Sequence, residues 1–155
     1  PVRTRVGHSF IKAVMAKEGA VFGGEHSAHY YFRDFFNADT GMLAAMRVLA
    51  ALGEQDGVLS ELADEYEPYS PSGEINSEVV DKAGAVARVL ADFASEDVTI
   101  DELDGTTVSS ADGAWWFNLR PSNTEPFLRY NGEAKNPETM AAVRDRVLSI
   151  VRDAK

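Results

Sequence analysis

A stretch rich in proline and glycine, PYSPSG at residues 68–73, divides the sequence into two parts of different character. Proline fixes its own backbone angle and restricts the residue before it, so a helix or a central strand does not continue through such a stretch. The part before it holds short segments broken by glycines, and the part after it holds longer strand and helix patterns. The sequence therefore predicts two units, residues 1–66 and residues 67–155.

The second part has the pattern of an antiparallel sheet covered by two helices. Apolar residues at helical spacing predict a helix from Ser77 or Glu78 to Ala94, and Asn136-Pro137 is typical of the start of a last helix. Four strands are expected, near residues 70–76, 98–103 with 106–109, 115–119 and 127–133. This pattern predicts an α+β domain with a four-stranded antiparallel sheet.

The first part contains short strand-like and helical segments. The segment PVRTRV is strand-like, and Asp39 is the expected cap of a helix with the sequence GMLAAMRVLAALG. Arg47 is the only charged residue of that helix, so we expect the helix to be buried on most sides. Because position 1 is a proline and regular patterns begin at once, we expect the sequence to be a piece of a longer chain.

Composition limits the classes of function that the chain can have. With 45% hydrophobic and 26% charged residues it has the balance of a soluble globular protein, and no apolar run is long enough for a membrane span. The absence of cysteine excludes disulfides and thiolate metal sites, and it favours a cytoplasmic location. A formal net charge of −10 disfavours nucleic-acid binding and requires a local cluster of donors for any anionic ligand.

A run of polar residues between two apolar strand patterns contains Arg120, Ser122, Asn123 and Thr124. A phosphate dianion is bound well by a forked guanidinium, by short hydroxyl and amide donors and by the backbone amides of a turn. Alternatively, serine, asparagine and proline are ordinary turn residues, and Arg120 pairs with a surface carboxylate. Spacing alone leaves both interpretations open.

A glycine-containing segment, GGEHSAH at residues 23–29, carries a second group of candidate residues. Its glycines allow a sharp turn and a close approach to a ligand. Glu25 can accept hydrogen bonds from a polyol, and Ser27 can both donate and accept them. The alternative is a simple glycine turn.

All histidines of the chain lie within its first 29 residues: His8, His26 and His29. A histidine in a cleft can move a proton near neutral pH. For His26 we favour a structural or solvent-exposed role, whereas for His8 and His29 the residues alone leave a catalytic and a structural role open. A metal site made of Glu25, His26 and His29 is disfavoured because HSAH lacks the His-Glu-x-x-His pattern of a helical zinc site.

Taken together, these segments resemble the phosphohexomutase family, specifically its phosphomannomutase/phosphoglucomutase branch. GGEHSAH is similar to the sugar-binding loop of that family, and RPSNTEP followed by Leu128-Arg129 is similar to its phosphate-binding loop. VGHSFIK, residues 6–12, resembles the histidine-bearing stretch that precedes the sugar loop. His29 and Asn123 are typical of phosphomannomutases, whereas Ala28 stands where glycine is commoner.

The resemblance implies the later part of the family's third, α/β domain for residues 1–66 and its fourth domain, with the topology of the TATA-binding protein, for residues 67–155. It implies an enzyme that interconverts hexose 6-phosphate and hexose 1-phosphate through a bisphosphate intermediate and an enzyme phosphoserine. The phosphoserine and the magnesium loop are expected in domains that would precede Pro1. The chain is therefore expected to be inactive alone.

Each candidate residue acquires an expected role from the resemblance. The residues expected to hold the phosphate that is not reacting are Arg120, Ser122, Asn123 and Thr124. Glu25 and Ser27 would bind the 3- and 4-hydroxyls of the sugar, and His29, together with His8, would lie near the reacting hydroxyl. The implied partners are hexose phosphates, a hexose 1,6-bisphosphate intermediate or activator and the missing N-terminal domains, without nucleic acid or membrane. A non-catalytic module that binds a sugar phosphate or another anion is the alternative.

Overall fold

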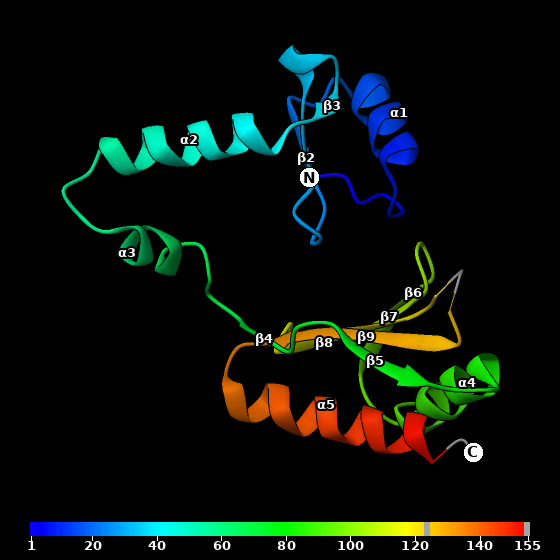
Figure 1. Ribbon diagram of the computed structural model, residues 1–155. Helices are drawn as coiled ribbons and strands as arrows, with labels where there is room; N and C mark the ends of the chain where they lie inside the picture. Colours follow the sequence, from blue (N-terminus) through cyan, green and yellow to red (C-terminus); the bar gives the residue numbers. More distant parts are fainter. Residues whose placement is uncertain (123–124, 154–155) are drawn as a thin grey trace. The chain divides into compact units, whose positions relative to one another are not determined.

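The computed structural model describes residues 1–122 and 125–153, and its chain divides into two units, Pro1–Tyr66 and Glu67–Lys155 (Figure 1). Each unit has a sheet and a core of its own. Among the described residues, no helix is both long and apolar enough to cross a membrane. Asn123 and Thr124, two of the residues expected to bind phosphate, lie outside the described residues.

The first unit is built on three short antiparallel strands. β1 (Phe22–Gly24) pairs with β2 (Tyr30–Phe32), and β2 pairs with β3 (Ala38–Asp39). α1 (His8–Glu18) packs against β1, and its Ile11 and Met15 form a small core with Tyr31 of β2. A Cβ atom on Gly23 would lie 2.9 Å from Met15 Sδ and 3.0 Å from Ile11 Cγ2. Gly23 therefore allows the helix to approach the strand closely.

The remaining elements of the first unit are the 3-10 helix η1 (Arg33–Phe35), α2 (Gly41–Gly53) and α3 (Leu59–Asp64). The side chain of Thr40 caps α2 by accepting a hydrogen bond from Leu43 N at 3.3 Å. The prediction that Asp39 caps this helix is wrong, because the Asp39 carboxylate binds His29 and the backbone of Tyr30. The expected burial of α2 is also wrong: within the described chain none of its residues is buried, and Met42 is 81% exposed.

The second unit is a six-stranded antiparallel sheet with α4 (Lys82–Asp92) and α5 (Pro137–Arg152) on one face (Figure 1). The strands are β4 (Ser70–Pro71), β5 (Ile75–Glu78), β6 (Val98–Asp101), β7 (Thr106–Ser110), β8 (Trp115–Pro121) and β9 (Phe127–Ala134). Their order is β4-β9-β8-β7-β6, and β5 also pairs with β9. The expected α+β class, with an antiparallel sheet and two helices, is confirmed.

The number of strands differs from the four that were expected. The segment expected at residues 70–76 is divided into β4 and β5, and the candidate expected from residues 98–103 with 106–109 forms two separate strands, β6 and β7. Gly73 (φ 66°) and Gly105 (φ 71°) lie in the two breaks. A residue in the left-handed region does not continue a strand, and glycine adopts this conformation at the lowest cost.

Two other predictions, the start of a helix and the presence of a strand, are corrected by the structure. α4 begins at Lys82 and not at Ser77 or Glu78, because Ile75–Glu78 pairs with β9 as a strand. The side chain of Asp81 caps α4 by accepting from Gly84 N at 2.8 Å. The strand-like segment at residues 1–6 forms no strand.

The core of the second unit lies between the sheet and the two helices. Its fully buried side chains include Val89 of α4 and Phe93, which directly follows α4. Phe117 of β8, Tyr130 of β9 and Val147 of α5 are also fully buried. β8 and β9, which form the longest strand pair, carry part of this core. The core therefore fixes both ends of the connection between these strands, where the expected phosphate-binding residues lie.

Candidate functional site

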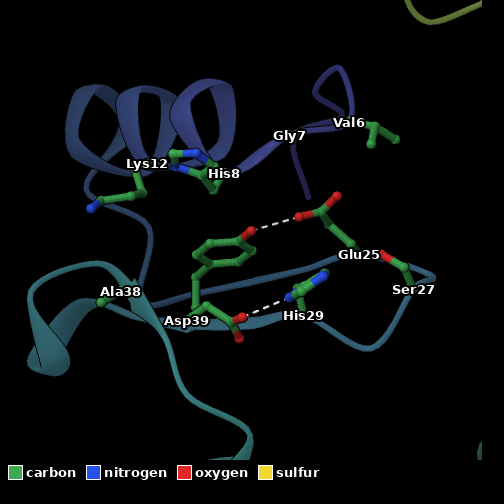
Figure 2. A pocket seen from close by; sticks show the side chains of 10 residues that line it. Val6, Gly7, His8, Lys12, Glu25, Ser27, His29, Ala38 and Asp39 are labelled. Atoms are coloured by element: carbon green, nitrogen blue, oxygen red, sulfur yellow. Dashed lines mark hydrogen bonds and ion pairs between the residues drawn. The ribbon is translucent and has the colours of Figure 1, made fainter. Parts of the chain in front are cut away.

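A pocket of about 490 Å³ in the first unit brings together four of the expected site residues (Figure 2). Its lining residues are Val6, Gly7, His8, Lys12, Glu25, Ser27, His29, Tyr31, Ala38 and Asp39. His8 and Lys12 belong to α1, whereas Glu25, Ser27 and His29 belong to the connection between β1 and β2. His26 is exposed and does not line the pocket.

The tight connection between β1 and β2 presents Glu25, Ser27 and His29 to the pocket. Glu25 N donates to His29 O at 2.9 Å, and Ala28 N donates to Glu25 O at 3.0 Å. Ala28 has φ 64°, in the left-handed region, where a residue with a Cβ atom is strained by about 1–2 kcal/mol. The left-handed residue of this turn is thus Ala28, and the two glycines at residues 23–24 lie in β1 instead.

His29 is held by Asp39, which reaches it from β3 (Figure 2). His29 Nδ1 lies 2.6 Å from Asp39 Oδ2, and Tyr30 N donates to Asp39 Oδ1 at 2.9 Å. The hydrogen bond to Asp39 raises the pKa of His29 above its ordinary value, and the same bond lowers the pKa of Asp39. A carboxylate at Nδ1 favours the tautomer in which Nε2 can accept a proton. Asp39 therefore orients His29 and stabilises its protonated form.

Glu25 is held by Tyr31, a residue of β2. The hydroxyl of Tyr31 donates to Glu25 Oε1 at 2.5 Å, and the Tyr31 side chain is only 1% exposed. Burial, together with this hydrogen bond, raises the pKa of Tyr31 to about 12, so the hydroxyl keeps its proton. A carboxylate accepts several hydrogen bonds. Glu25 can therefore bind a ligand hydroxyl while Tyr31 fixes its position.

Sequence patterns did not assign three polar lining residues to a site: Lys12, Tyr31 and Asp39. Lys12 lies one helical turn after His8, and the i, i+4 spacing of the two residues could have signalled their shared position. Tyr31 and Asp39 are opposite each other in the β2–β3 register. No sequence spacing signals this register, because two short strands are joined through a 3-10 helix.

The second group of expected residues lies at the connection between β8 and β9. Ser122 N donates to Phe127 O at 2.9 Å, and Ser122 Oγ accepts from Glu125 N at 3.2 Å. The neighbouring Arg129 pairs with two carboxylates: those of Glu74 at 3.4 Å and Glu125 at 3.3 Å. The connection is thus closed by hydrogen bonds at both of its described ends.

Arg120 lies in β8, directly opposite Arg129 in the register of β9. Within residues 1–122 and 125–153, the guanidinium of Arg120 makes no ion pair and no hydrogen bond. The alternative in which Arg120 pairs with a surface carboxylate is therefore not seen in the described part of the chain.

Within the described residues, no group of three or more His, Cys, Asp or Glu side chains could hold a metal ion. The carboxylates of the pocket, Glu25 and Asp39, are instead bound to Tyr31 and His29.

Models of two consecutive domains of one protein family match nearly the whole chain. The model described as "Phosphoglucomutase/phosphomannomutase, alpha/beta/alpha domain III" matches residues 1–69. The model described as "Phosphoglucomutase/phosphomannomutase, C-terminal domain" matches residues 74–150. The chain therefore belongs to the phosphoglucomutase/phosphomannomutase family of phosphohexomutases.

Individual relatives agree with this assignment. The phosphomannomutase of Salmonella typhimurium strain LT2 is 44% identical over 149 residues, which are 96% of this chain and 32% of the relative. The phosphomannomutase of Escherichia coli strain K12 is 42% identical over the same shares of the two chains. A crystal structure of a phosphoglucomutase/phosphomannomutase family protein from Burkholderia thailandensis matches 99% of this chain and 32% of its own, with 25% identity and a TM-score of 0.79. The chain thus spans about a third of the length of these relatives.

Proposed function

We propose that these residues form the substrate-binding part of a phosphomannomutase/phosphoglucomutase, an isomerase that interconverts hexose 6-phosphate and hexose 1-phosphate through a hexose 1,6-bisphosphate. The observation that carries the proposal is the convergence of His8, Glu25, Ser27 and His29 on one pocket. In such a reaction, an enzyme phosphoserine donates and recovers the phosphoryl group, and Mg²⁺ neutralises its charge. Both are expected from another part of the protein, so these residues would bind the substrate without converting it.

Glu25 and Ser27 are suited to the hydroxyls of a sugar ring. A carboxylate accepts hydrogen bonds from neighbouring hydroxyls, and a serine hydroxyl both donates and accepts. The 3- and 4-hydroxyls can be presented similarly when the substrate binds in either of two orientations. Because Tyr31 fixes Glu25, the carboxylate would be in place before the sugar binds.

His29 has the setting of a general base. Its Nδ1 is bound to Asp39, which leaves Nε2 to accept the proton of a hydroxyl that attacks phosphorus. Asp39 then stabilises the imidazolium that forms. Proton transfer by a positioned side chain typically contributes about 10²- to 10⁴-fold to a rate. His8 lines the same pocket from α1 and is the second candidate for a proton-transfer or binding role.

Arg120 and Ser122 would bind the phosphate that is not reacting, with Asn123 and Thr124 added by the resemblance. A guanidinium binds two phosphate oxygens at once, and this pairing gives direction as well as strength. The absence of a protein partner for Arg120 within the described residues supports this role. The local donors would also offset the formal net charge of −10.

An NMR titration of the 155-residue chain with glucose 6-phosphate and mannose 1-phosphate tests the proposal. We expect saturable shifts at two places: near Arg120 and Ser122, and at Glu25, Ser27 and His29. Inorganic phosphate should reproduce only the first set, and Arg120→Ala should abolish that set.

Two outcomes would contradict the proposal. The absence of shifts at millimolar sugar phosphate, in this chain and in the full-length protein, would remove both binding roles. Shifts confined to Arg120 and Ser122, together with no mutase activity in the full-length protein, would identify a non-catalytic anion-binding module instead.

A further inference from the structure

Lys82, the first residue of α4, reaches both described ends of the β8–β9 connection. Its Nζ donates to Glu125 O at 2.9 Å and to Ser122 O at 3.4 Å. Ser122 and Glu125 flank the centre of the expected phosphate loop. One side chain from a distant segment therefore bridges the two ends of the connection.

We propose that Lys82 is a positioning residue for phosphate binding. It holds the described ends of the β8–β9 connection together so that Ser122, together with Arg120, is in place before the anion arrives. This inference rests on the phosphate-binding role proposed above, and it adds a residue that acts through the loop.

Lysine is an unfavourable choice at the start of a helix for the helix itself. The helix dipole places partial positive charge at this end, so an ammonium in the first turn is repelled. The cap of α4 is also complete without Lys82, since Asp81 accepts from Gly84 N at 2.8 Å. What Lys82 gains in return is the pair of carbonyl contacts, which points to a role in the loop and not in the helix.

The backbone around this contact fixes where the Lys82 ammonium lies. Val79 N donates to Pro126 O at 3.1 Å, so the segment that leads into α4 is bound to the end of the β8–β9 connection. The half-buried Lys82 side chain follows three residues later and continues the same contact. Hydrogen bonds from a charged donor are stronger than neutral ones. Pre-ordering of a binding segment increases affinity because less conformational freedom is lost on binding.

The Lys82 ammonium would also add local positive charge at the connection. The ammonium lies next to the described ends of the loop, in a chain whose net charge repels anions. Positioning and charge can be separated by substitution. Lys82→Met removes both, Lys82→Gln keeps a donor without the charge, and Lys82→Arg keeps the charge and the donors.

Lys135 offers a matched control. It also donates from Nζ to a backbone carbonyl, that of Asp112 at 3.3 Å, but Asp112 belongs to the turn between β7 and β8. Lys135→Met removes the same charge and one carbonyl contact while leaving the contacts of Ser122 and Glu125 intact. Lys82→Met removes a lysine contact from the β8–β9 connection, whereas Lys135→Met removes one from the β7–β8 turn.

The experiment measures two quantities by NMR on the 155-residue chain: amide hydrogen exchange at Ser122 and Glu125, and the affinity for inorganic phosphate. In Lys82→Met we expect faster exchange at both amides and a rise in the phosphate Kd of about tenfold, as for the loss of a charged hydrogen bond. Lys82→Arg should remain within about threefold of the original affinity, and Lys82→Gln should lie between the two. Lys135→Met should change neither quantity.

The outcomes separate this inference from the proposed function. Unchanged exchange and unchanged affinity in Lys82→Met would overturn the positioning role while leaving the phosphate site in place. An equal loss in Lys135→Met would also overturn it, because a general effect of charge would then be sufficient. Faster exchange in Lys82→Met without phosphate binding by any form of the chain would support the anchoring contact and reject the phosphate assignment. If Lys82→Met does not fold, the comparison of Lys82→Gln with Lys82→Arg decides in the same way.

Discussion

Asp39 binds His29 and the backbone of the neighbouring strand residue at the same time. One carboxylate oxygen lies 2.6 Å from His29 Nδ1, and the other accepts from Tyr30 N at 2.9 Å. Both oxygens are therefore engaged, and the carboxylate is fixed to the strand that carries the histidine. The orientation of the imidazole thus follows from strand pairing.

Asp39→Asn should lower the pKa of His29, because the charge and the acceptor that favour the imidazolium are removed. A pH titration of the His29 Cε1 resonance measures this change. In the full-length enzyme, the acid limb of kcat/KM should shift to lower pH in the variant. An unchanged titration midpoint for His29 would show that the contact is not formed in solution.

The same pair predicts how stability depends on pH. The contribution of His29, whose pKa is raised, is fully present below its ordinary value of 6.5 and is lost as pH rises through the raised value. The contribution of Asp39, whose pKa is lowered, is present above its ordinary value of 3.8 and is lost as pH falls through the lowered value. Urea denaturation should therefore show the largest difference between the original chain and Asp39→Asn near about pH 5. A difference that grows above about pH 9 would contradict this sign.

Tyr31→Phe should weaken sugar binding, because Glu25 loses the donor that fixes it. We expect the KM for hexose phosphate in the full-length enzyme to rise about tenfold and the stability to fall by about 1 kcal/mol. Tyr30→Phe is a matched control, since the Tyr30 hydroxyl makes no hydrogen bond to any residue that the structure describes. An equal effect of both variants on KM would argue against the role of the Tyr31–Glu25 contact.

Ala28→Gly should stabilise the chain, because glycine adopts φ 64° without the strain of a Cβ atom. The gain is expected to be about 0.5–1 kcal/mol, since glycine also has more conformational freedom to lose on folding. Chemical denaturation measures this free energy. The opposite substitution effect is expected in α2, where Ala44→Gly should destabilise by about 1 kcal/mol. A loss of stability in Ala28→Gly would mean that the turn does not adopt the left-handed conformation.

Gly105→Ala should destabilise the second unit through close contact with β8. A Cβ atom there would lie 2.6 Å from Leu119 O and 3.0 Å from Arg120 Cα, at a residue with φ 71°. We expect a loss of about 1–3 kcal/mol and weaker phosphate binding, because the backbone of Arg120 must shift. Gly113→Ala is the control: its φ is 67°, but among the described residues no atom beyond its chain neighbours lies within 4 Å of the added Cβ. The midpoint of thermal unfolding should fall further for Gly105→Ala, and equal losses would show that only backbone strain matters.

Local patterns predicted the elements whose determinants are close in sequence. The Asn136 cap and the apolar stripe of α5, and the strands near Phe117 and Tyr130, are set by residues within one turn or one strand of each other. The two candidate loops were also found from contiguous residues. The interactions that determine these elements join residues that are close in sequence, so a local pattern includes both partners.

The features that local patterns missed depend on distant residues. Asp39 is a residue type that commonly caps helices, but strand pairing brings its side chain to His29, and Thr40 caps α2 instead. Lys82 lies 40 residues before the carbonyl of Ser122 that it contacts. The two partners of each contact lie in different segments of the chain, so a local sequence pattern includes only one of them. Such contacts follow only from the folded topology.

The second unit is contiguous in sequence, and every strand of its sheet pairs only with strands between Ser70 and Ala134. A genetic crossover near the codon for Glu67 would therefore separate no strand from its partner. It would transfer the candidate phosphate loop, its lysine contact and its supporting core as one block. Recombination between related genes could thus exchange the candidate phosphate loop while the pocket of the first unit is inherited unchanged.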